Sequence, residues 1–332
     1  MEVLATGVQR DERPLLERAF APRHQVRCLE TTLTADTLPL AAGYEAVSTH
    51  VNSVLDAPAL ETLARGGTRL ITQRSTGYNN IDLAHAERLG LTITRVARYS
   101  PYSVAEFAWT LAMALNRRVV RAANRTRDLD FRLGGLVGRD FHGRTVGVIG
   151  TGRIGTAFTA IARGFGMRLL AWDIAVNPAC AELGAEYVAL DHLLRESDLI
   201  SLHVPLMPST HHLLSARRLA ELKDDAIVVN TSRGALIDSD ALVETLRQGR
   251  LGGVGLDMYE EEAGVFFYDK SLEVMNDDTL TQLLTFGNVL VTSYQAYYTV
   301  DALEEIVAAT VRNVDDYLAG RITECTLIPK SP

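Results

Sequence analysis

A glycine-rich segment at residues 150–155 carries the clearest chemical signal in the chain. It reads Gly150-Thr151-Gly152-Arg153-Ile154-Gly155 and lies between an apolar run over 145–149 and a stretch with helical patterning. At a turn from strand to helix, the first glycine permits a tight bend, the second lets the backbone approach a pyrophosphate, and the third lets the helix pack against the strand. The segment predicts a dinucleotide site formed by Gly150, Gly152, Arg153, Ile154 and Gly155.

Asp173 indicates which dinucleotide is bound. It lies 18 positions after Gly155, at the end of the next apolar run, 168–172. A carboxylate at this place can accept hydrogen bonds from the adenosine ribose hydroxyls, and it repels a 2′-phosphate. Residues 174–177 include no arginine that could attract such a phosphate. The sequence therefore predicts NAD rather than NADP.

The elements that must position these residues alternate regularly along the chain. Short apolar runs suited to strands occur at 46–49, 70–72, 91–93, 145–149, 168–172, 199–203, 226–230, 253–256 and 289–292. Helical patterning predicts one helix over about 103–121 and a last one over about 300–318. This alternation is typical of the α/β class, and we expect two Rossmann-like doubly wound domains.

The composition narrows the classes of partner. A formal net charge of −8 disfavours nucleic acid, because its binders concentrate Lys and Arg. Three cysteines far apart indicate neither a disulfide framework nor a paired-cysteine metal site, and they fit a reducing cytoplasm. The amino terminus lacks the features of a signal peptide, and no apolar run reaches about 18 residues. We therefore expect a cytoplasmic protein with no membrane partner.

His211 and His212 are adjacent and offer a residue type that binds metals. Neighbouring side chains are expected to point in different directions, and no cysteine or acid close in the sequence completes a tetrahedral set. We expect a structural or surface role for this pair and no metal site.

Three longer motifs follow predicted strands, where ligands lie in open α/β sheets. They are NTSRGALID at 230–238, GLDMYE at 255–260 followed by Glu262, and NVLVTSYQA at 288–296. Together with the glycine segment, HVPL at 203–206 and YSPY at 99–102, these motifs resemble the D-2-hydroxyacid dehydrogenase family. The similarity is strongest to its D-lactate dehydrogenases and the related enzymes of vancomycin resistance, and it covers nearly the whole chain.

The resemblance implies an NAD-dependent enzyme that interconverts a 2-keto acid and a D-2-hydroxy acid, usually as a homodimer. It implies a substrate domain of residues 1–98 plus 299–332 and an NAD-binding domain of residues 99–298. It places Arg233 on the substrate carboxylate and keto oxygen, through a planar fork that lysine lacks. Asp257 then holds the nicotinamide carboxamide, and Glu262 takes the place of the acid that orients a catalytic histidine.

Further positions follow from the same resemblance. The backbone N–H groups of Thr76, Gly77 and Tyr78 are expected at the substrate carboxylate, and Tyr99 is expected as an aromatic lid. The remaining cofactor contacts are assigned to His203, Val204, Pro205, Thr231 and Ser232. Simple packing is the alternative for Tyr78 and Tyr99, and a solvated surface charge is the alternative for Arg233 and Glu262.

The chain departs from the family pattern at Tyr294, where the family has its catalytic histidine. None of the eight histidines lies after residue 212, so no small shift of alignment restores one. A phenol, with a pKa near 10, stays protonated at pH 7 and can still donate its proton during reduction. Oxidation then needs alkaline pH or a different base.

Three interpretations of Tyr294 remain open. In the first, Tyr294 is the working acid. In the second, the substrate needs little acid-base help, or another group supplies it. In the third, catalysis is lost or the residue was engineered, which leaves a non-catalytic NAD-binding regulator or pseudoenzyme. Retention of Arg233, Asp257 and Glu262 favours an enzyme, because a dead site has no chemical need for all three.

A second departure is Arg98, which precedes Tyr99. With Arg74 and Arg233 it could make the substrate pocket unusually positive and suit a substrate with a second anion, such as a dicarboxylate or a phosphonate. The alternative is a solvated arginine that pairs with a surface acid.

Overall fold

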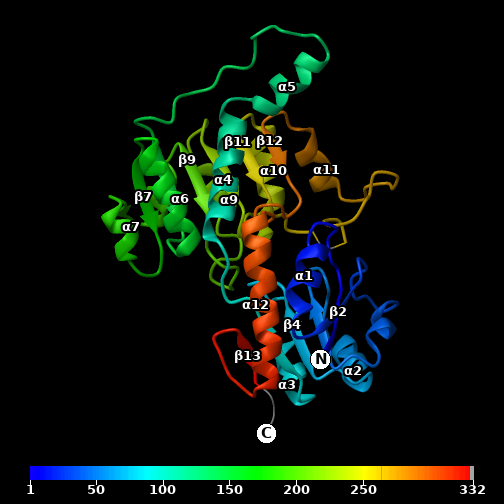
Figure 1. Cartoon of the computed structure of the whole chain (residues 1–332). Coiled ribbons are helices and arrows are strands. Elements are labelled where there is room, and N and C mark those ends of the chain that lie inside the picture. Colours follow the sequence, from blue (N-terminus) through cyan, green and yellow to red (C-terminus); the bar gives the residue numbers. More distant parts are fainter. Residues whose placement is uncertain (263, 330–332) are drawn as a thin grey trace. The chain divides into compact units, whose positions relative to one another are not determined.

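The computed structural model describes residues 1–262 and 264–329, which form two compact units (Figure 1). Unit 1 comprises residues 1–100 together with the chain from residue 298 onward. Unit 2 comprises residues 101–297. Each unit is an α/β structure built on its own sheet, which confirms the expected fold class.

Unit 1 has the strands β1 (Glu2–Ala5), β2 (Gln25–Cys28), β3 (Ala46–Thr49), β4 (Leu70–Gln73), β5 (Thr92–Arg95) and β13 (Thr326–Ile328). Its helices are α1 (Arg13–Phe20), α2 (Ala57–Arg65), α3 (Leu83–Arg88) and α12 (Val300–Leu318), with a 3₁₀ turn at Leu38–Ala41. The sheet order is β13-β5-β4-β3-β1-β2, parallel except for the antiparallel pairing of β13 with β5. The order from β2 to β5 is that of a doubly wound sheet.

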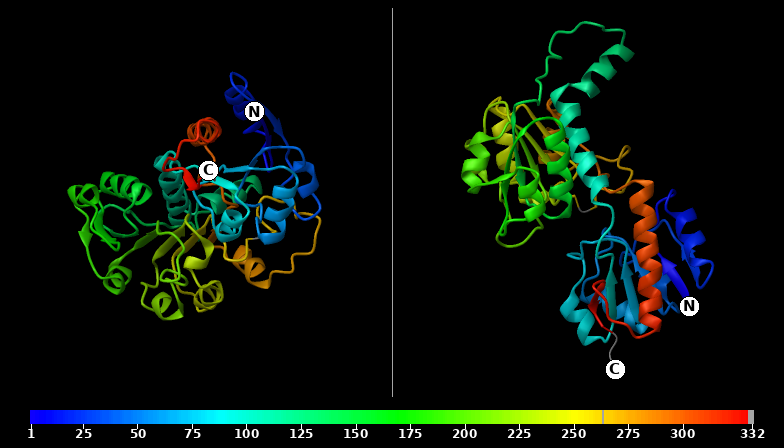
Figure 2. Two further views of the ribbon diagram at one scale, coloured as in Figure 1. Left: turned by 90° about the horizontal axis from the view of Figure 1, so that it is seen from below. Right: turned by 60° about the vertical axis from the view of Figure 1, so that its left-hand side comes forward.

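The sheet of unit 1 is buried on both faces. Strands β3 and β4 bury every residue, as expected for parallel strands covered by helices. The predicted last helix is α12, which begins at the cap Thr299 and packs with α1 and β4 (Figure 2). Its buried residues Val307, Val311 and Val314 join the core beside Phe20 of α1.

Unit 2 has the strands β6 (Thr145–Ile149), β7 (Arg168–Trp172), β8 (Glu186–Tyr187), β9 (Leu199–Leu202), β10 (Ile227–Asn230), β11 (Gly253–Leu256) and β12 (Val289–Val291). Its helices are α4 (Pro101–Asn116), α5 (Val119–Arg127), α6 (Arg153–Gly164), α7 (Pro178–Glu182), α8 (Leu190–Glu196), α9 (Ala216–Ala220), α10 (Ser239–Arg247) and α11 (Asp278–Thr285), with a 3₁₀ turn at Gly234–Leu236. The sheet runs β12-β11-β10-β9-β6-β7-β8 with parallel pairings.

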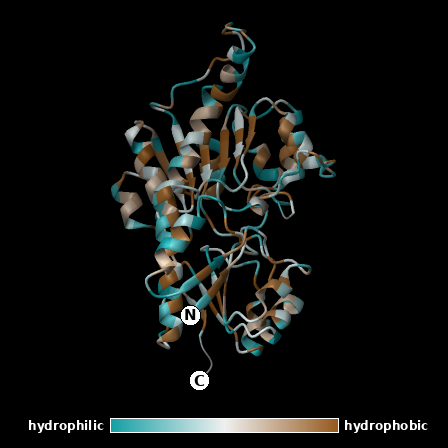
Figure 3. Ribbon diagram, turned by 45° about the vertical axis from the view of Figure 1, so that its right-hand side comes forward, coloured by the Kyte–Doolittle hydropathy of each residue, from teal (hydrophilic) through white to brown (hydrophobic). Residues whose placement is uncertain are grey.

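This order reverses direction at β6, which pairs with β7 on one side and β9 on the other. In open α/β sheets a ligand binds outside the carboxyl ends of the strands at such a switch point. The apolar strands form the brown centre of the unit in Figure 3 and are covered by helices. The loops after β6 and β9 therefore lie where a dinucleotide site is expected.

The single helix predicted over 103–121 is wrong, because the structure has two helices, α4 and α5. Arg118 separates them with a left-handed backbone, φ 51°. The side chain of Asn116 fixes this turn by bonding both the carbonyl oxygen and the N–H of Arg139, at 2.8 and 3.1 Å. No glycine or proline marks the break, so local sequence does not reveal it.

Within the described chain, no helix combines the length and apolar character needed to cross a membrane.

Candidate active site

The glycine segment forms the turn from β6 into α6. Gly150 has φ +93°, and a Cβ there would lie 2.7 Å from the carbonyl carbon of His203. A Cβ on Gly155 would lie 1.9 Å from the oxygen of Gly150, so the third glycine brings the helix onto the turn. At Gly152, by contrast, no atom of the described residues lies within 4 Å of the Cβ position. This open backbone at the start of α6 suits a pyrophosphate, which the unpaired N–H groups of a first helical turn attract.

Asp173 lies beside this turn, at the carboxyl end of β7. One carboxylate oxygen accepts from the N–H and the hydroxyl of Thr151, at 2.6 and 3.1 Å, and the other accepts from the N–H of Ile174 at 2.7 Å. The hydroxyl of Tyr187 donates in turn to that of Thr151 at 2.8 Å. The carboxylate is therefore held next to the phosphate loop and keeps lone pairs for ribose hydroxyls.

The loop after β9 carries His203, Val204 and Pro205. The His203 N–H donates to Ile149 of β6 at 2.7 Å, and its ring nitrogen Nε2 lies 2.9 Å from the hydroxyl of Ser201. Burial lowers the pKa of His203 to about 3, so the imidazole stays neutral. A neutral ring beside the phosphate loop suits packing against a cofactor and gives no base at physiological pH.

The loop after β10 joins this side of the site to Arg233. The hydroxyl of Ser232 donates to the carbonyl oxygen of Val204 at 2.6 Å. The hydroxyl oxygen of Thr231 is buried and has no hydrogen-bond partner among the described residues. A buried polar atom of this kind is ready to bond a ligand. Together with the open backbone at Gly152 and the Asp173 carboxylate, it fits a bound dinucleotide.

Gly234 brings the loop of Arg233 against the loop after β11. A Cβ at residue 234 would lie 2.0 Å from the carbonyl carbon of Tyr259, so only glycine allows this approach. The side-chain amide of Asn230 holds the carbonyl oxygen of Arg233 at 2.8 Å. The Arg233 guanidinium donates to the carbonyl oxygen of Ser232 at 2.6 Å, which leaves most of its donors for other groups.

Asp257 organises the loop after β12. Its fully buried carboxylate accepts from the hydroxyl of Thr292 at 2.6 Å and from the N–H groups of Gln295 and Ala296 at 2.7 and 2.8 Å. Burial raises the pKa of Asp257, and these hydrogen bonds oppose the rise. The sequence resemblance did not indicate this anchoring role, and a nicotinamide contact for Asp257 stays a prediction.

Tyr294 lies in the loop that Asp257 anchors. Its backbone is left-handed, φ 58°, which is uncommon for an aromatic residue. Its ring packs against Phe267 and Tyr297, with centroids 5.6 and 5.9 Å away. Burial raises the pKa of Tyr294, while the nearby Arg233 guanidinium opposes the rise through charge and a hydrogen bond. The phenol is therefore protonated throughout the physiological range.

Glu262 is the third ionisable residue of the site, after Arg233 and Tyr294. Its carboxylate accepts from the Tyr259 N–H at 3.1 Å. Burial raises the pKa of Glu262 to about 7, against the opposing charge of Arg233. The Tyr294 side chain forms a hydrogen bond with Arg233, and the charges of Glu262 and Arg233 shift the pKa of Tyr294 in opposite directions. A cation, an acid and a phenol thus meet beyond the carboxyl ends of β10, β11 and β12.

The loop after β4 in unit 1 presents the backbone N–H groups of Thr76, Gly77 and Tyr78. Its carbonyl groups are held: Gly77 accepts from the amide of Gln73 at 3.0 Å and from Ser75 at 2.7 Å, and Thr76 accepts from Arg95 at 2.8 Å. Among the described residues, no acceptor is found for the three N–H groups. A fixed row of unpaired N–H groups suits an anion.

Of the two interpretations of Arg98, the free cation is not what the structure shows. Arg98 forms a two-pronged ion pair with Glu324, one contact of which measures 3.0 Å. Arg74 is 1% exposed and donates to Glu12 at 2.7 Å, so it too is neutralised. The alternative, an arginine paired with a surface acid, describes Arg98. The neighbouring Tyr99 is partly buried, and its role as a lid stays a prediction.

The expectation for the adjacent histidines was also wrong in its geometry. The His212 backbone is left-handed, φ 47°, and the rings of His211 and His212 stack with centroids 4.0 Å apart. Glu260, distant in sequence, contacts His212 Nε2 at 2.6 Å. The fold therefore supplies the acid that the local sequence lacks.

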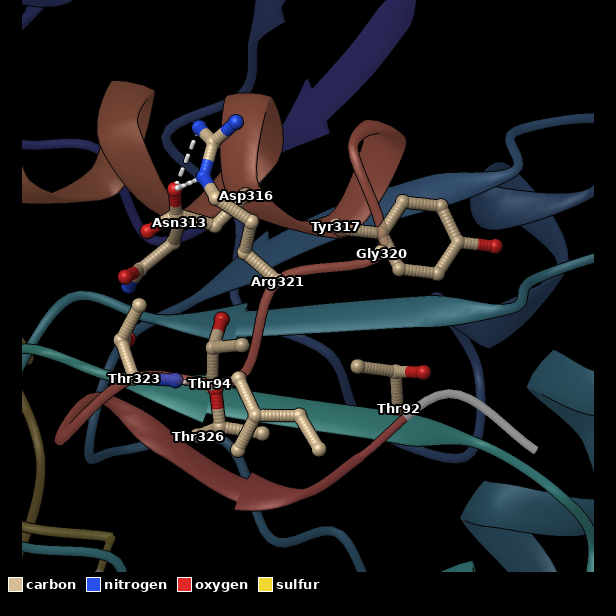
Figure 4. A pocket seen from close by; sticks show the side chains of 10 residues that line it. Thr92, Thr94, Asn313, Asp316, Tyr317, Gly320, Arg321, Thr323 and Thr326 are labelled. Carbon is tan, nitrogen blue, oxygen red and sulfur yellow. Dashed lines mark hydrogen bonds and ion pairs between the residues drawn. The ribbon is translucent and has the colours of Figure 1, made fainter. Parts of the chain in front are cut away.

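A small cavity in unit 1, about 60 Å³ in volume, lies between β5, β13 and the end of α12 (Figure 4). Threonines 92, 94, 323 and 326 line it, and the ion pair of Asp316 with Arg321 borders it. This size suits a few water molecules rather than a substrate and cofactor.

The parallel sheet of unit 2, with a glycine turn and an acid at its switch point, defines a dinucleotide-binding protein. Residues 109–296 match the model for the NAD-binding domain of D-isomer-specific 2-hydroxyacid dehydrogenases. The chain therefore belongs to the D-2-hydroxyacid dehydrogenase family, and it is an NAD-dependent dehydrogenase.

Individual relatives align with this chain over nearly its full length. The D-lactate dehydrogenase kk1H of Curvularia clavata is 46% identical over 308 residues, which cover 93% of this chain and 88% of the relative. The apo structure of Escherichia coli D-lactate dehydrogenase superposes with a TM-score of 0.90 at 40% identity and covers 99% of this chain and all of its own. The Aquifex aeolicus D-lactate dehydrogenase, solved with NAD and lactic acid, gives 0.87 at 32% identity, with 99% and 100% covered.

Proposed function

We propose that this enzyme reduces a small 2-keto acid with one carboxylate to the D-2-hydroxy acid, and catalyses the reverse reaction more slowly at neutral pH. The observation that carries the proposal is the meeting of Arg233, Glu262 and Tyr294 beyond the ends of three neighbouring strands. Similarity to proteins named D-lactate dehydrogenase supports a substrate of the lactate and pyruvate class.

Substrate binding uses groups with fixed geometry. The N–H groups of Thr76, Gly77 and Tyr78 bind the carboxylate, in keeping with their unpaired state. The guanidinium of Arg233 polarises the keto oxygen and also contacts the carboxylate, because its planar fork offers several donors. These donors suffice for a substrate with one carboxylate, so no second cation is needed.

Tyr294 supplies the proton. The glycine turn and Asp173 would hold NADH, which would supply the hydride. The charge that develops on the keto oxygen is stabilised by Arg233, and the Tyr294 hydroxyl donates its proton to that oxygen. The Arg233 guanidinium also stabilises the resulting phenolate, because it lowers the pKa that burial raises. Glu262 interacts with both groups through its charge.

The deciding experiment compares Tyr294→Phe with Tyr294→His in NADH-dependent reduction of pyruvate. The Phe variant removes only the hydroxyl, so kcat is expected to fall by about 10²-fold or more, the usual contribution of a positioned acid. The His variant is expected to restore activity. Full activity in the Phe variant would mean that the substrate needs no proton from residue 294.

The non-catalytic NAD-binding regulator considered from the sequence has no support from the relatives, which are named as dehydrogenases. It predicts NADH binding without turnover of any 2-keto acid between pH 6 and 10. A screen of keto acids and hydroxy acids by NADH absorbance, with NADH binding measured in parallel by fluorescence, separates the two functions. Turnover of any substrate in the screen excludes the regulator.

The inference of a substrate with a second anion rested on a free side chain at Arg98. A dicarboxylate or phosphonate needs a free cation, whereas Arg98 is paired with Glu324 and Arg74 with Glu12. We therefore place monocarboxylates first. A keto dicarboxylate and a keto phosphonate belong in the same screen, where a higher kcat/KM for either would reverse this order.

We also propose that the enzyme is a homodimer in a reducing, cytoplasmic compartment. The segment after α5 exposes Leu129, Phe131, Leu133 and Val137, each by at least 71%, and it extends away from the sheet of unit 2 (Figure 2). Apolar residues exposed in such a row are typical of a surface that another chain covers. Phe131→Asp is expected to give a monomer in light-scattering measurements.

A further inference from the structure

Three groups able to bind a metal meet on unit 2, beside the loops of the active site. One ligand atom each from His211, His212 and Glu260 lies within 4.8 Å of the other two. His212 Nε2 lies 2.6 Å from the Glu260 carboxylate, and Asp238 lies 3.8 Å from the other nitrogen of His212. The histidines follow β9 and Glu260 follows β11, so the cluster joins two loops at the carboxyl edge of the sheet.

The backbone of His212 is what turns the two rings to the same side. A residue other than glycine at φ 47° is uncommon and costs free energy, so the surrounding structure must hold it there. It is held on one side by the bond from its N–H to the carbonyl oxygen of Ala235 at 2.8 Å. With an ordinary extended backbone, adjacent side chains point apart, and no common ligand could reach both imidazoles.

The donor set has the chemistry of a zinc site. Two imidazoles and one carboxylate are the protein ligands of one common class of zinc site, in which a fourth position stays open to water. Two such ligands on one ion lie about 3.3 Å apart when bonds of about 2.0 Å meet at the tetrahedral angle. The contact of His212 with Glu260, at 2.6 Å, needs to lengthen by only a small side-chain movement.

Contacts with neighbouring elements hold Glu260 and the histidine segment in place. The second oxygen of Glu260 accepts from the N–H of Ser239, at the start of α10, at 3.3 Å. The residue pair Leu214 and Ile237 forms a parallel bridge, which ties the histidine segment to the loop that follows Arg233. His211 is exposed, so an ion can enter from solvent. An ion pair between His212 and Glu260 alone does not explain why the imidazole of His211 stacks on that of His212.

We propose that His211, His212 and Glu260 bind a divalent transition-metal ion of the zinc class, which fastens the loop after β9 to the loop after β11. This site departs from the sequence-based expectation that the histidines have no metal role. It is independent of the proposed reaction, because none of its ligands takes part in hydride or proton transfer.

The test is direct binding of zinc to the whole protein. After removal of metals with a chelator and dialysis, wild-type protein is titrated with Zn²⁺ by calorimetry, and its melting temperature is measured with and without the ion. One equivalent is expected to bind and to raise the Tm, because a ligand selective for the folded state stabilises it. No catalytic turnover is needed, so the outcome is separate from that of the pyruvate assay.

Matched variants assign the ligands. His211→Ala changes an exposed side chain and leaves the fold intact, and it is expected to weaken zinc binding at least tenfold. Glu260→Gln keeps the shape and removes the charge, with a similar loss. His192→Ala, on α8 of the same unit, is the control and is expected to bind as wild type does. Equal binding by wild type and His211→Ala, or no stoichiometric binding by wild type, overturns the proposal.

Discussion

The N–H of Tyr294 donates to the carbonyl oxygen of Asp257 over 2.9 Å, while the carboxylate of Asp257 accepts from residues on both sides of that tyrosine. One buried acid at the end of β11 thus holds the loop after β12 in its left-handed conformation. The anchor therefore fixes the backbone that carries the phenol.

Asp257→Asn tests the anchor. An amide can accept at one oxygen, but its NH₂ group then faces the N–H of Ala296, and a buried donor is left without a partner. The free energy of unfolding is expected to fall by about 1–3 kcal/mol, and kcat is expected to fall with it. Urea unfolding and pyruvate reduction measure the two effects. Asp36→Asn, on an exposed acid, is the control, and an unchanged kcat in Asp257→Asn would contradict the anchoring role.

The pH dependence of reduction should distinguish a phenol from an imidazole at residue 294. Burial raises the pKa of Tyr294 above its ordinary value, so the phenol keeps its proton, and the capacity to donate it, through neutral pH and into the alkaline range. An imidazole in Tyr294→His, with an ordinary pKa near 6.5, loses its proton as the pH rises through neutrality. Reduction by the His variant should therefore decline toward alkaline pH more steeply than reduction by wild type.

The measurement is kcat for pyruvate reduction from pH 6 to 10 in both proteins. Tyr294→Phe provides the baseline without any titrating group at this position, so that contributions from other residues can be subtracted. Identical profiles for the wild type and the His variant would show that residue 294 does not control the proton.

Gly234→Ala should separate the loop that carries Arg233 from the loop that carries Glu262. The new Cβ would lie 2.0 Å from the backbone of Tyr259, which cannot move aside as a flexible side chain could. Overpacking of this kind costs about 1–3 kcal/mol, and the separated loops should lower kcat/KM for pyruvate. Gly287→Ala is the matched control, because no atom of the described residues lies within 4 Å of its Cβ position. Wild-type activity in Gly234→Ala would show that the loops need not be in contact.

The turn at residues 150–155 and the strands of unit 2 could be predicted because their signals are local. Buried parallel strands are continuous apolar runs, and a glycine turn followed by a helix fits in one short segment. The contacts that corrected the site are distant in sequence: Arg98 meets Glu324, and His212 meets Glu260. Nothing in the residues around Arg98 shows which acid will neutralise it. The left-handed backbones of Arg118 and His212 depend on tertiary contacts in the same way.

Arg98→Ala should leave substrate preference unchanged. Arg98 is exposed and paired with Glu324, so its charge is already balanced and screened by solvent. The KM values for a keto monocarboxylate and a keto dicarboxylate are expected to stay the same within error, and the melting temperature should change little. Glu324→Gln is the complementary variant, since it frees the arginine. A selective rise in the dicarboxylate KM of Arg98→Ala would restore the doubly anionic substrate.

Asp173→Ala should weaken the preference for NAD over NADP. The carboxylate at the end of β7 is held by the N–H and hydroxyl of Thr151, so it faces the ribose position with its charge fixed. Its removal abolishes the hydrogen bonds to the ribose hydroxyls and the repulsion of a 2′-phosphate, which act in the same direction on the ratio. The ratio of kcat/KM with NADH to kcat/KM with NADPH is expected to fall at least about tenfold, or about 1.4 kcal/mol. Glu186→Ala, which removes an acid from the neighbouring β8, controls for the general loss of negative charge. If both variants change the ratio equally, the preference arises from the overall field of the unit and not from the fixed carboxylate.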